Sequence, residues 1–196
     1  VEITLGTEVI RTSADDAIGY IKKTMSGDVM NIKKIRVDKE GAGMGWGAVY
    51  AQYLESMDQI SGQGNGLSVS RQLYKGDEAL NESAPLKIGD KITVRLTIKA
   101  DRDMDFVQIK DDRAACMEPL QAVSGFRWST GLGYYQATKD ASTQFFIDQM
   151  RKGTYVIEYQ VYVNRTGEYQ AGIATVQSAY APEFGGHTGG YRVMVE

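Results

Sequence analysis

The sequence has little of what catalytic and metal-binding proteins commonly use. Among its 196 residues there are one cysteine, Cys116, one histidine, His187, and three prolines. A single cysteine excludes a disulfide within the chain, and with it a small disulfide-stapled module. One cysteine and one histidine cannot supply the ligands of a zinc site, so we expect neither a metal nor a cofactor. No run approaches the roughly 18 apolar residues that a membrane span requires.

An excess of charge of one sign is also missing, because 22 basic residues stand against 25 acidic ones, a net charge of −3. Nucleic acid is not expected as a partner, since binding phosphates requires a net basic face. The basic stretch Lys22–Lys39 does not change this, because residues 1–60 hold seven basic and nine acidic side chains. The chain starts at Val1 inside an alternating pattern with no leader segment, so we expect a piece of a longer protein.

Alternation of apolar and polar residues dominates the second half of the chain. Ile92–Ile98 alternates without a break, as a half-buried strand does. Similar runs predict strands at 66–74, 105–110, 154–163, 168–178 and 190–196, with turn residues such as Gly89-Asp90 and Gly185-Gly186 between them. Met117–Ser124 is the one stretch there that favours a helical turn. Short strands of this kind predict an all-β fold, an antiparallel β-sandwich.

The first sixty residues leave helix and strand open as alternatives. Ser13–Asp16 could cap a helix that runs on to Met25, whereas Gly19 and Thr24 favour a strand. Ala48–Ile60 has the same ambiguity. Ser61–Gly66 contains three glycines in six residues. It therefore predicts a domain boundary, with one domain in residues 1–62 and the other in residues 63–196.

The sequence shows no set of nucleophile, base and orienting group of the kind that a serine or cysteine hydrolase needs. His187 lies in the glycine-rich segment 185–190, which is too mobile to hold a catalytic imidazole, so a histidine in a surface turn is the better interpretation. Gly43–Ala48 fits a dinucleotide-binding fingerprint formally, but no strand–helix–strand series follows it. We therefore expect no enzyme activity.

Three carboxylates resemble the start of a calcium-binding loop. Asp101, Asp103 and Asp105 have the spacing of every second residue, but Phe106 stands where that loop needs glycine for its sharp turn. Solvated side chains in a turn between two strands are the better interpretation.

Seven segments form an ordered set that is more specific than any single motif. They are Trp46–Tyr53, Leu67–Tyr74, Ile88–Val94, Asp111–Pro119, Ser124–Trp128, Lys152–Tyr155 and Tyr180–His187. In this order and near this spacing they resemble the C-terminal end of the bacterial alpha-2-macroglobulins, large envelope-associated protease traps related to the complement thioester proteins. The resemblance covers almost the whole chain.

The resemblance implies the returning half of a CUB domain in residues 1–62, a partial β-sheet, followed by the last macroglobulin-like, immunoglobulin-like β-sandwich. It implies strands in both ambiguous segments, at Gly19–Thr24 and Trp46–Tyr53. The family's reactive thioester motif is absent, because Cys116 is followed by Met117, Glu118 and Pro119, with no glutamine at the required offset. The chain is therefore expected to be a non-catalytic part of such a protein.

The function implied by the resemblance is mechanical, within a broad-spectrum endopeptidase inhibitor. In such proteins the last sandwich packs on the thioester domain, keeps the reactive bond dry, and shifts when a protease cuts elsewhere. The partners implied are the thioester and other macroglobulin-like domains of the parent chain, and target proteases reached through it, in the bacterial periplasm or cell envelope. The domain-interface residues implied are Tyr180, Ala181, Pro182, Glu183 and His187, with Tyr180 the most important; alternatively, Tyr180 and Pro182 only end a strand and pack on the sandwich edge.

A rival interpretation is a free-standing cell-surface sandwich that binds carbohydrate or a protein ligand through aromatic residues around Trp128, Tyr134 and Tyr135. If residues 1–62 are half a CUB domain, they leave an apolar face uncovered. We expect this face to pack on the C-terminal sandwich or to form a homodimer through residues 1–60. Its candidate members are Ile3, Leu5, Ile21, Ile35, Val37, Val49 and Tyr53.

Overall fold

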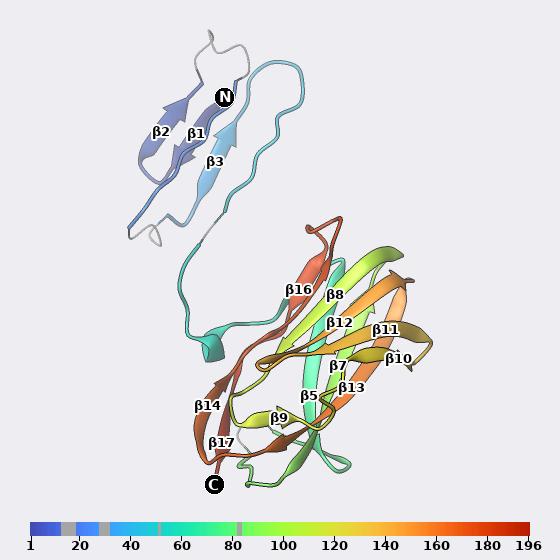
Figure 1. Cartoon of the computed structure of the whole chain (residues 1–196). Helices are drawn as coiled ribbons and strands as arrows, with labels where there is room; N and C mark the ends of the chain where they lie inside the picture. The colour runs from blue at the N-terminus through green and yellow to red at the C-terminus, as the bar shows by residue number, and fades with distance from the viewer. Residues whose placement is uncertain (13–18, 28–31, 51, 82–83) are drawn as a thin grey trace. The chain divides into compact units, whose positions relative to one another are not determined.

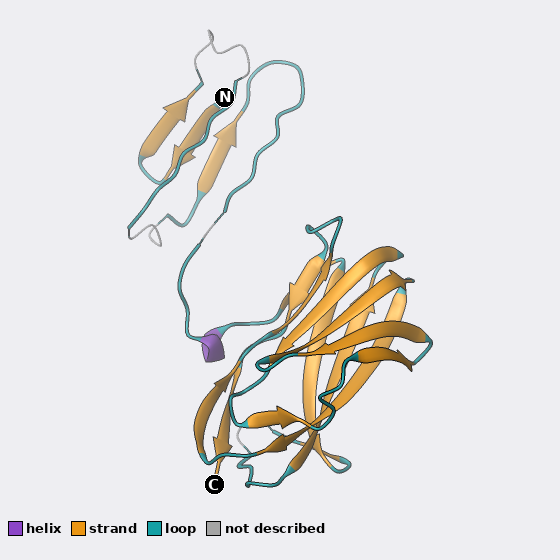
Figure 2. Ribbon diagram, viewed as in Figure 1, coloured by secondary structure: helices purple, strands orange, loops and turns teal. Residues whose placement is uncertain are grey.

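The computed structural model describes residues 1–12, 19–27, 32–50, 52–81 and 84–196. Contacts divide the chain into two units, Val1–Gln52 and Tyr53–Glu196, a division about ten residues before the one predicted from glycine content. The regular elements in the described residues are strands, apart from one 3-10 turn, η2 (Met57–Gln59), as Figure 2 shows. The all-β prediction is confirmed. The described part holds no helix long and apolar enough to cross a membrane.

The first unit is built on a small antiparallel sheet. Its strand order is β2 (Glu8–Arg11), β1 (Glu2–Leu5), β3 (Ile35–Asp38). In the centre Ile3 pairs with Ile10 on one side and with Val37 on the other. Its CUB identity stays a prediction.

The two further strands that the resemblance implied for this unit were predicted wrongly. Gly19–Thr24 is irregular, and so are the described residues of Trp46–Tyr53, where the Trp46 side chain is 90% exposed. Extended chain becomes a stable strand only where it pairs or packs, and the described residues give neither segment a strand partner. The helical alternative for Ala48–Ile60 reduces to η2. The helix that Ser13–Asp16 could cap is wrong over residues 19–25, which are irregular, and its residues 13–18 lie outside the described residues.

The face expected to be apolar in this unit is only partly covered. Ile3, Leu5 and Ile21 are half-buried, while Val37 and Val49 are exposed. The proposed homodimer through residues 1–60 stays a prediction.

The second unit is a two-layer sandwich (Figure 1). One layer has the strand order β10-β11-β12-β8-β15 and the other β5-β7-β13-β9; β16 and β4 join them edge to edge, β6 pairs with β5, and β14 pairs with β17. All of these strand pairs are antiparallel. The strands are β4 (Gln63–Asn65), β5 (Leu67–Lys75), β6 (Glu78–Ala79), β7 (Lys91–Ala100), β8 (Met104–Asp112), β9 (Met117–Pro119), β10 (Gly125–Ser129), β11 (Leu132–Thr138), β12 (Ser142–Met150), β13 (Gly153–Val163), β14 (Gly167–Ala171), β15 (Ala174–Ser178), β16 (Gly185–His187) and β17 (Tyr191–Val195).

The core lies between the two layers and follows the alternation seen in the sequence. On β7 each second side chain, from Ile92 to Ile98, is buried. Phe145 of β12 meets Tyr159 of β13 across the sandwich with ring centroids 5.9 Å apart, and Tyr134 of β11 at 5.6 Å. Burying such rings is a dominant favourable contribution to folding, which explains why the sandwich is the well-packed part of the chain.

Two further sequence predictions for this unit are corrected. The run 168–178 is two strands, β14 and β15, which belong to different sheets. The helical turn expected at Met117–Ser124 is wrong, because Met117–Pro119 forms β9 and pairs with the Val161–Val163 end of β13.

The glycines at 185 and 186, expected to form a turn, lie in strand β16 instead. A side chain on Gly186 would place its Cβ 2.7 Å from the carbonyl oxygens of Gln63 and Leu67. Glycine is needed at this position because the neighbouring backbone comes too close for any side chain. A pair of glycines required for close packing cannot be told from a pair of glycines in a turn by sequence alone.

Candidate functional site

The loop between β15 and β16 is the part of the sandwich in which most of the predicted interface residues meet. We call it the 178–184 loop. Its ends are closed by a hydrogen bond from the Ser178 amide to the Phe184 carbonyl (3.0 Å), and its tip by one from the Phe184 amide to the Ala181 carbonyl (2.9 Å). Asn65 donates to the Glu183 carbonyl at 2.7 Å. The loop is therefore held by its own backbone and by β4, and also by β8 and β15, through the Phe106 carbonyl and the Gln177 side chain.

Phe184 anchors this loop to the sandwich. The Arg102 guanidinium lies over its ring, 4.5 Å from the centroid, a cation–π contact. On the other side Gly66 has φ +70°, and a Cβ there would stand 2.7 Å from the Phe184 ring. The anchor thus depends on a glycine at the start of β5.

Tyr180 is presented outward at the tip of the loop. Its side chain is 80% exposed, and one edge of its ring meets Phe106 of β8, with centroids 5.1 Å apart and planes at 84°. An exposed tyrosine held on one side is suited to contact another protein surface, because it adds apolar area and a hydroxyl at low cost in conformational entropy. The contact with Phe106 also fits the alternative interpretation, in which Tyr180 only packs on the edge of the sandwich.

The predicted interface residues do not all share one place. Tyr180, Ala181, Pro182 and Glu183 belong to the 178–184 loop, whereas His187 lies in β16, paired with Thr175 of β15. Its ring Nδ1 stands 3.1 Å from the Thr188 carbonyl oxygen. The expectation of a histidine in a surface turn is therefore wrong. The glycines before His187 allow close packing of β16 against neighbouring backbone and do not form a turn. The interface role of all five residues stays a prediction.

The residues considered above as catalytic or metal-binding candidates are buried or already bonded to other protein groups. Cys116 is fully buried, and burial raises the pKa of its thiol, which disfavours the reactive thiolate. Asp101 binds Arg102, and Asp103 accepts a hydrogen bond from the Lys152 amide at 2.7 Å. Within the described ranges no three histidine, cysteine or acidic side chains are grouped as metal ligands.

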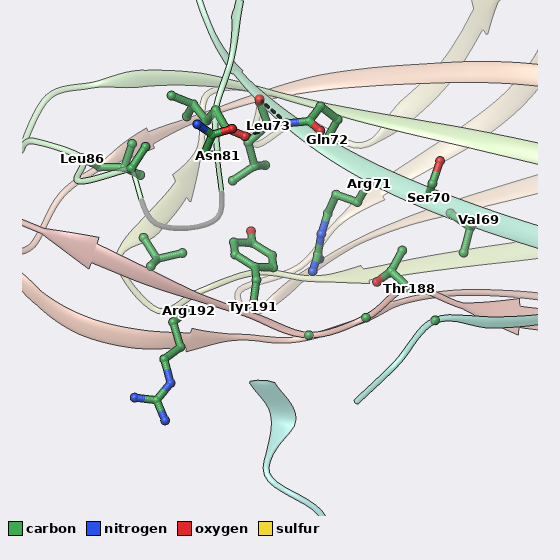
Figure 3. Close-up of a pocket in the computed structure, with 16 residues that line it drawn as sticks. Val69, Ser70, Arg71, Gln72, Leu73, Asn81, Leu86, Thr188, Tyr191 and Arg192 are labelled. Atoms are coloured by element: carbon green, nitrogen blue, oxygen red, sulfur yellow. Dashed lines mark hydrogen bonds between the residues drawn. The ribbon is translucent and has the colours of Figure 1, made fainter. Parts of the chain in front are cut away.

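A cavity of about 300 Å³ opens between β5 and the segment that leads into β17 (Figure 3). Arg71 and Tyr191 both line it, and the Arg71 guanidinium lies 4.5 Å from the centre of the Tyr191 ring. Arg71 donates to the Asp111 carboxylate and, at 2.6 Å, to the Gly172 carbonyl. Asp111 also accepts from the Tyr159 hydroxyl at 2.8 Å. We call these four side chains the buried cluster.

The buried cluster is charge-neutral, and the side chains of its ion pair are 5% exposed at Arg71 and 1% exposed at Asp111. Burial raises the pKa of Asp111, although Arg71 acts against this, and burial raises the pKa of Tyr191 to about 12. The pKa of Tyr159 is also well above its ordinary value, first because of burial and then because of Asp111. A guanidinium already paired in this way has no free charge for a ligand, so the cluster joins strands of both layers rather than forming an active site.

A row of aromatic side chains covers the outer face of one layer. Phe126, Tyr135 and Phe146 stand opposite one another on β10, β11 and β12, and Phe126 meets Tyr135 edge to face at 5.2 Å. Trp128, 76% exposed, lies against Gly133, where a Cβ would stand 2.7 Å from its ring. Tyr134, expected with Trp128 and Tyr135 in the rival interpretation, is instead buried in the core, since it has the opposite parity on β11.

Sequence reasoning missed two features that the alternation pattern could have revealed. Arg71 has the inward parity of Leu67 and Val69, and Asp111 that of Val107 and Ile109. Oppositely charged residues at core positions indicate a buried pair. Phe106, beside Tyr180, gave no such signal, because only its backbone conformation sets it apart.

The fold is that of a macroglobulin-like, immunoglobulin-like β-sandwich. Its candidate functional site is the 178–184 loop, which carries Tyr180. Residues 66–183 match the family model described as the bacterial alpha-2-macroglobulin MG10 domain. The chain belongs to this family, and the resemblance found in the sequence is confirmed.

The individual relatives are more distant. An alpha-2-macroglobulin homolog from Nostoc is 27% identical over 155 residues, which cover 69% of this chain and 8% of that protein. Circularly permutated Ras protein 2 from Dictyostelium discoideum is 28% identical over 138 residues, 67% of this chain and 4% of that protein. Escherichia coli alpha-2-macroglobulin activated by porcine elastase superposes with a TM-score of 0.60 at 15% identity, over 70% of this chain and 14% of the other. That last likeness shows the fold alone, and this chain spans less than a tenth of the two sequence relatives.

Proposed function

We propose that this chain is a non-catalytic part of a bacterial alpha-2-macroglobulin that traps proteases, and that its 178–184 loop packs against the thioester domain. Tyr180 then covers the reactive bond and keeps water away from it, because a thioester survives only while its surroundings stay dry. In this proposal Ala181, Pro182, Glu183 and His187 complete the interface. The protein acts in the periplasm or cell envelope, and residues 1–62 complete a CUB domain.

One observation carries this proposal. Tyr180 is presented at the tip of a loop that is closed by two backbone hydrogen bonds and anchored through Phe184, yet four-fifths of its side chain is exposed. A loop braced in this way costs little entropy on docking. Membership of the family supports a role in trapping proteases, since a protein of the same fold is described as activated by porcine elastase.

The test replaces Tyr180 in the full-length protein. We expect Tyr180→Gly to release the thioester thiol faster in the absence of protease, measured as free thiol against time, and to lower the amount of protease captured. Tyr162→Gly is the matched control, because Tyr162 is an exposed tyrosine on β13, in the other layer. Equal rates of thiol release for Tyr180→Gly, Tyr162→Gly and the unmodified protein would refute the proposal.

A second candidate function, a surface module that binds glycans, is favoured by the aromatic row. Phe126, Trp128, Tyr135 and Phe146 share one solvent face, and such rings can stack on the apolar face of a sugar ring. A glycan array decides: binding that is lost in Trp128→Ala supports this function, whereas the absence of binding rejects it. Tyr74→Ala is a control in the other layer.

A further inference from the structure

Phe106 has a backbone conformation that bulky residues rarely adopt. Its φ is +52°, in the left-handed region, where a side chain with a Cβ is strained. The other non-glycine residue with positive φ in the described ranges is Thr130, which lies in the turn between β10 and β11. Phe106 instead lies inside β8, and no turn there explains the conformation.

The alternation of two neighbouring strands is interrupted next to this residue. On β8 the side chains of Met104 and Val107 are both buried, with two exposed residues between them. On β12 Ile147 and Met150 are likewise buried around an exposed pair. The shift falls on Met104, which is buried although it has the parity of Phe106 and Gln108. The Phe106 ring keeps the outward parity of Gln108, stands on the outer face of the layer and is 49% exposed.

Phe106 holds two successive residues of the 178–184 loop. Its carbonyl oxygen accepts a hydrogen bond from the Ala179 amide at 2.8 Å, and its ring meets the Tyr180 ring edge to face at 5.1 Å. Other braces of the loop hold its later residues: Asn65 donates to the Glu183 carbonyl at 2.7 Å, and Gln177 donates to the Pro182 carbonyl at 3.1 Å. The direction of the Tyr180 side chain thus depends on Phe106.

We propose that Phe106 is a positioning residue for Tyr180: its carbonyl oxygen holds the Ala179 amide, and its ring fixes Tyr180 in the orientation that meets the partner domain. The proposal rests on the proposed function, because it names the residue through which Tyr180 acts. Strain at Phe106 is retained because relieving it would turn away the ring against which Tyr180 packs.

The first measurement needs only this chain and is independent of any partner. Nuclear magnetic resonance of the Tyr180 ring protons should show a ring-current shift from Phe106 that is lost in Phe106→Leu and restored in Phe106→Tyr. Phe126→Leu, at another exposed aromatic position on the same layer, should leave the Tyr180 signals unchanged. Unchanged Tyr180 signals in Phe106→Leu would overturn the proposal.

The second measurement uses the full-length protein and thiol release without protease. We expect Phe106→Leu to speed release about two- to tenfold, the value of one aromatic pair, and Phe106→Tyr to restore the slow rate. Phe106→Leu combined with Tyr180→Gly should release no faster than Tyr180→Gly alone, whereas a general loss of stability would add to it. An additive effect, or no effect of Phe106→Leu where Tyr180→Gly has one, would overturn the inference. If Tyr180→Gly itself has no effect, the proposed function fails, and the resonance measurement alone decides the role of Phe106.

Discussion

Replacing Arg71 by methionine should strongly destabilise the sandwich. The change keeps the length of the side chain but removes the guanidinium, so Asp111, which is 1% exposed, loses its cation and keeps only the Tyr159 hydroxyl. The Gly172 carbonyl loses its 2.6 Å donor as well. Breaking a buried ion pair from one side costs about 3–5 kcal/mol. This is a large share of the roughly 5–15 kcal/mol that stabilises a domain.

The assay is thermal unfolding followed by circular dichroism, supported by urea titration. At about 2–4 °C per kcal/mol for a domain of this size, Arg71→Met should lower the midpoint by roughly 6–20 °C. Arg95→Met is a matched control, because Arg95 also pairs with a carboxylate, Glu158, and stacks on a tyrosine, Tyr74, but on the exposed face. Little change is expected there.

A double variant separates the pair from the packing. Arg71→Met with Asp111→Leu leaves no uncompensated charge, so it should recover most of the loss, since apolar replacement of a whole buried pair is often neutral. If Arg71→Met shifted the midpoint by less than about 2 °C, as the exposed Arg95 variant is expected to do, the reasoning on the buried cluster would be wrong.

Three further predictions concern other parts of the sandwich. Burial raises the pKa of Tyr191 to about 12, above its ordinary value of about 10. The stability contributed by its hydroxyl is therefore present below that ordinary value and is lost as the pH rises through the higher one. Urea midpoints at alkaline pH should show this loss, and Tyr191→Phe should show a smaller one, since Tyr159, whose pKa is also raised, remains. Gly186→Ala should destabilise by about 1–3 kcal/mol because its Cβ would stand 2.7 Å from two carbonyl oxygens, whereas Gly47→Ala, with open space around it, should melt like the unmodified protein. Cys116 should react with a thiol reagent only after unfolding, since it is buried and its pKa is raised; fast reaction of the native protein would contradict its placement.

The strands of the sandwich were largely predictable, because a period of two follows directly from a layer with one buried face. Ile92–Ile98 and Tyr155–Val163 show it, and both are central strands. In the same pattern Arg71 and Asp111 are charged residues at buried positions. The structure explains both, because they form an ion pair with each other. What periodicity could not give is the assignment of each strand to a layer.

The failures of sequence reasoning have two physical causes. Glycine serves both turns and close backbone contact, so Gly185 and Gly186 were read as a turn although they lie in β16. Strands also depend on partners, so Gly19–Thr24 did not form the strand that the family resemblance implied. The left-handed backbone of Phe106 could not be predicted either, because the residue type gives no sign of it.

The way in which the two layers are joined has a consequence for biosynthesis. The junction consists of β4, at residues 63–65, and β16, at residues 185–187, so it connects nearly the first strand of the sandwich to nearly the last. While the chain emerges from the ribosome, β4 has no β16 to pair with until almost the whole domain has been synthesised. Closure of the sandwich therefore depends on contacts between residues far apart in the sequence, and until β16 has been synthesised the edge of β4 that pairs with it has no partner strand.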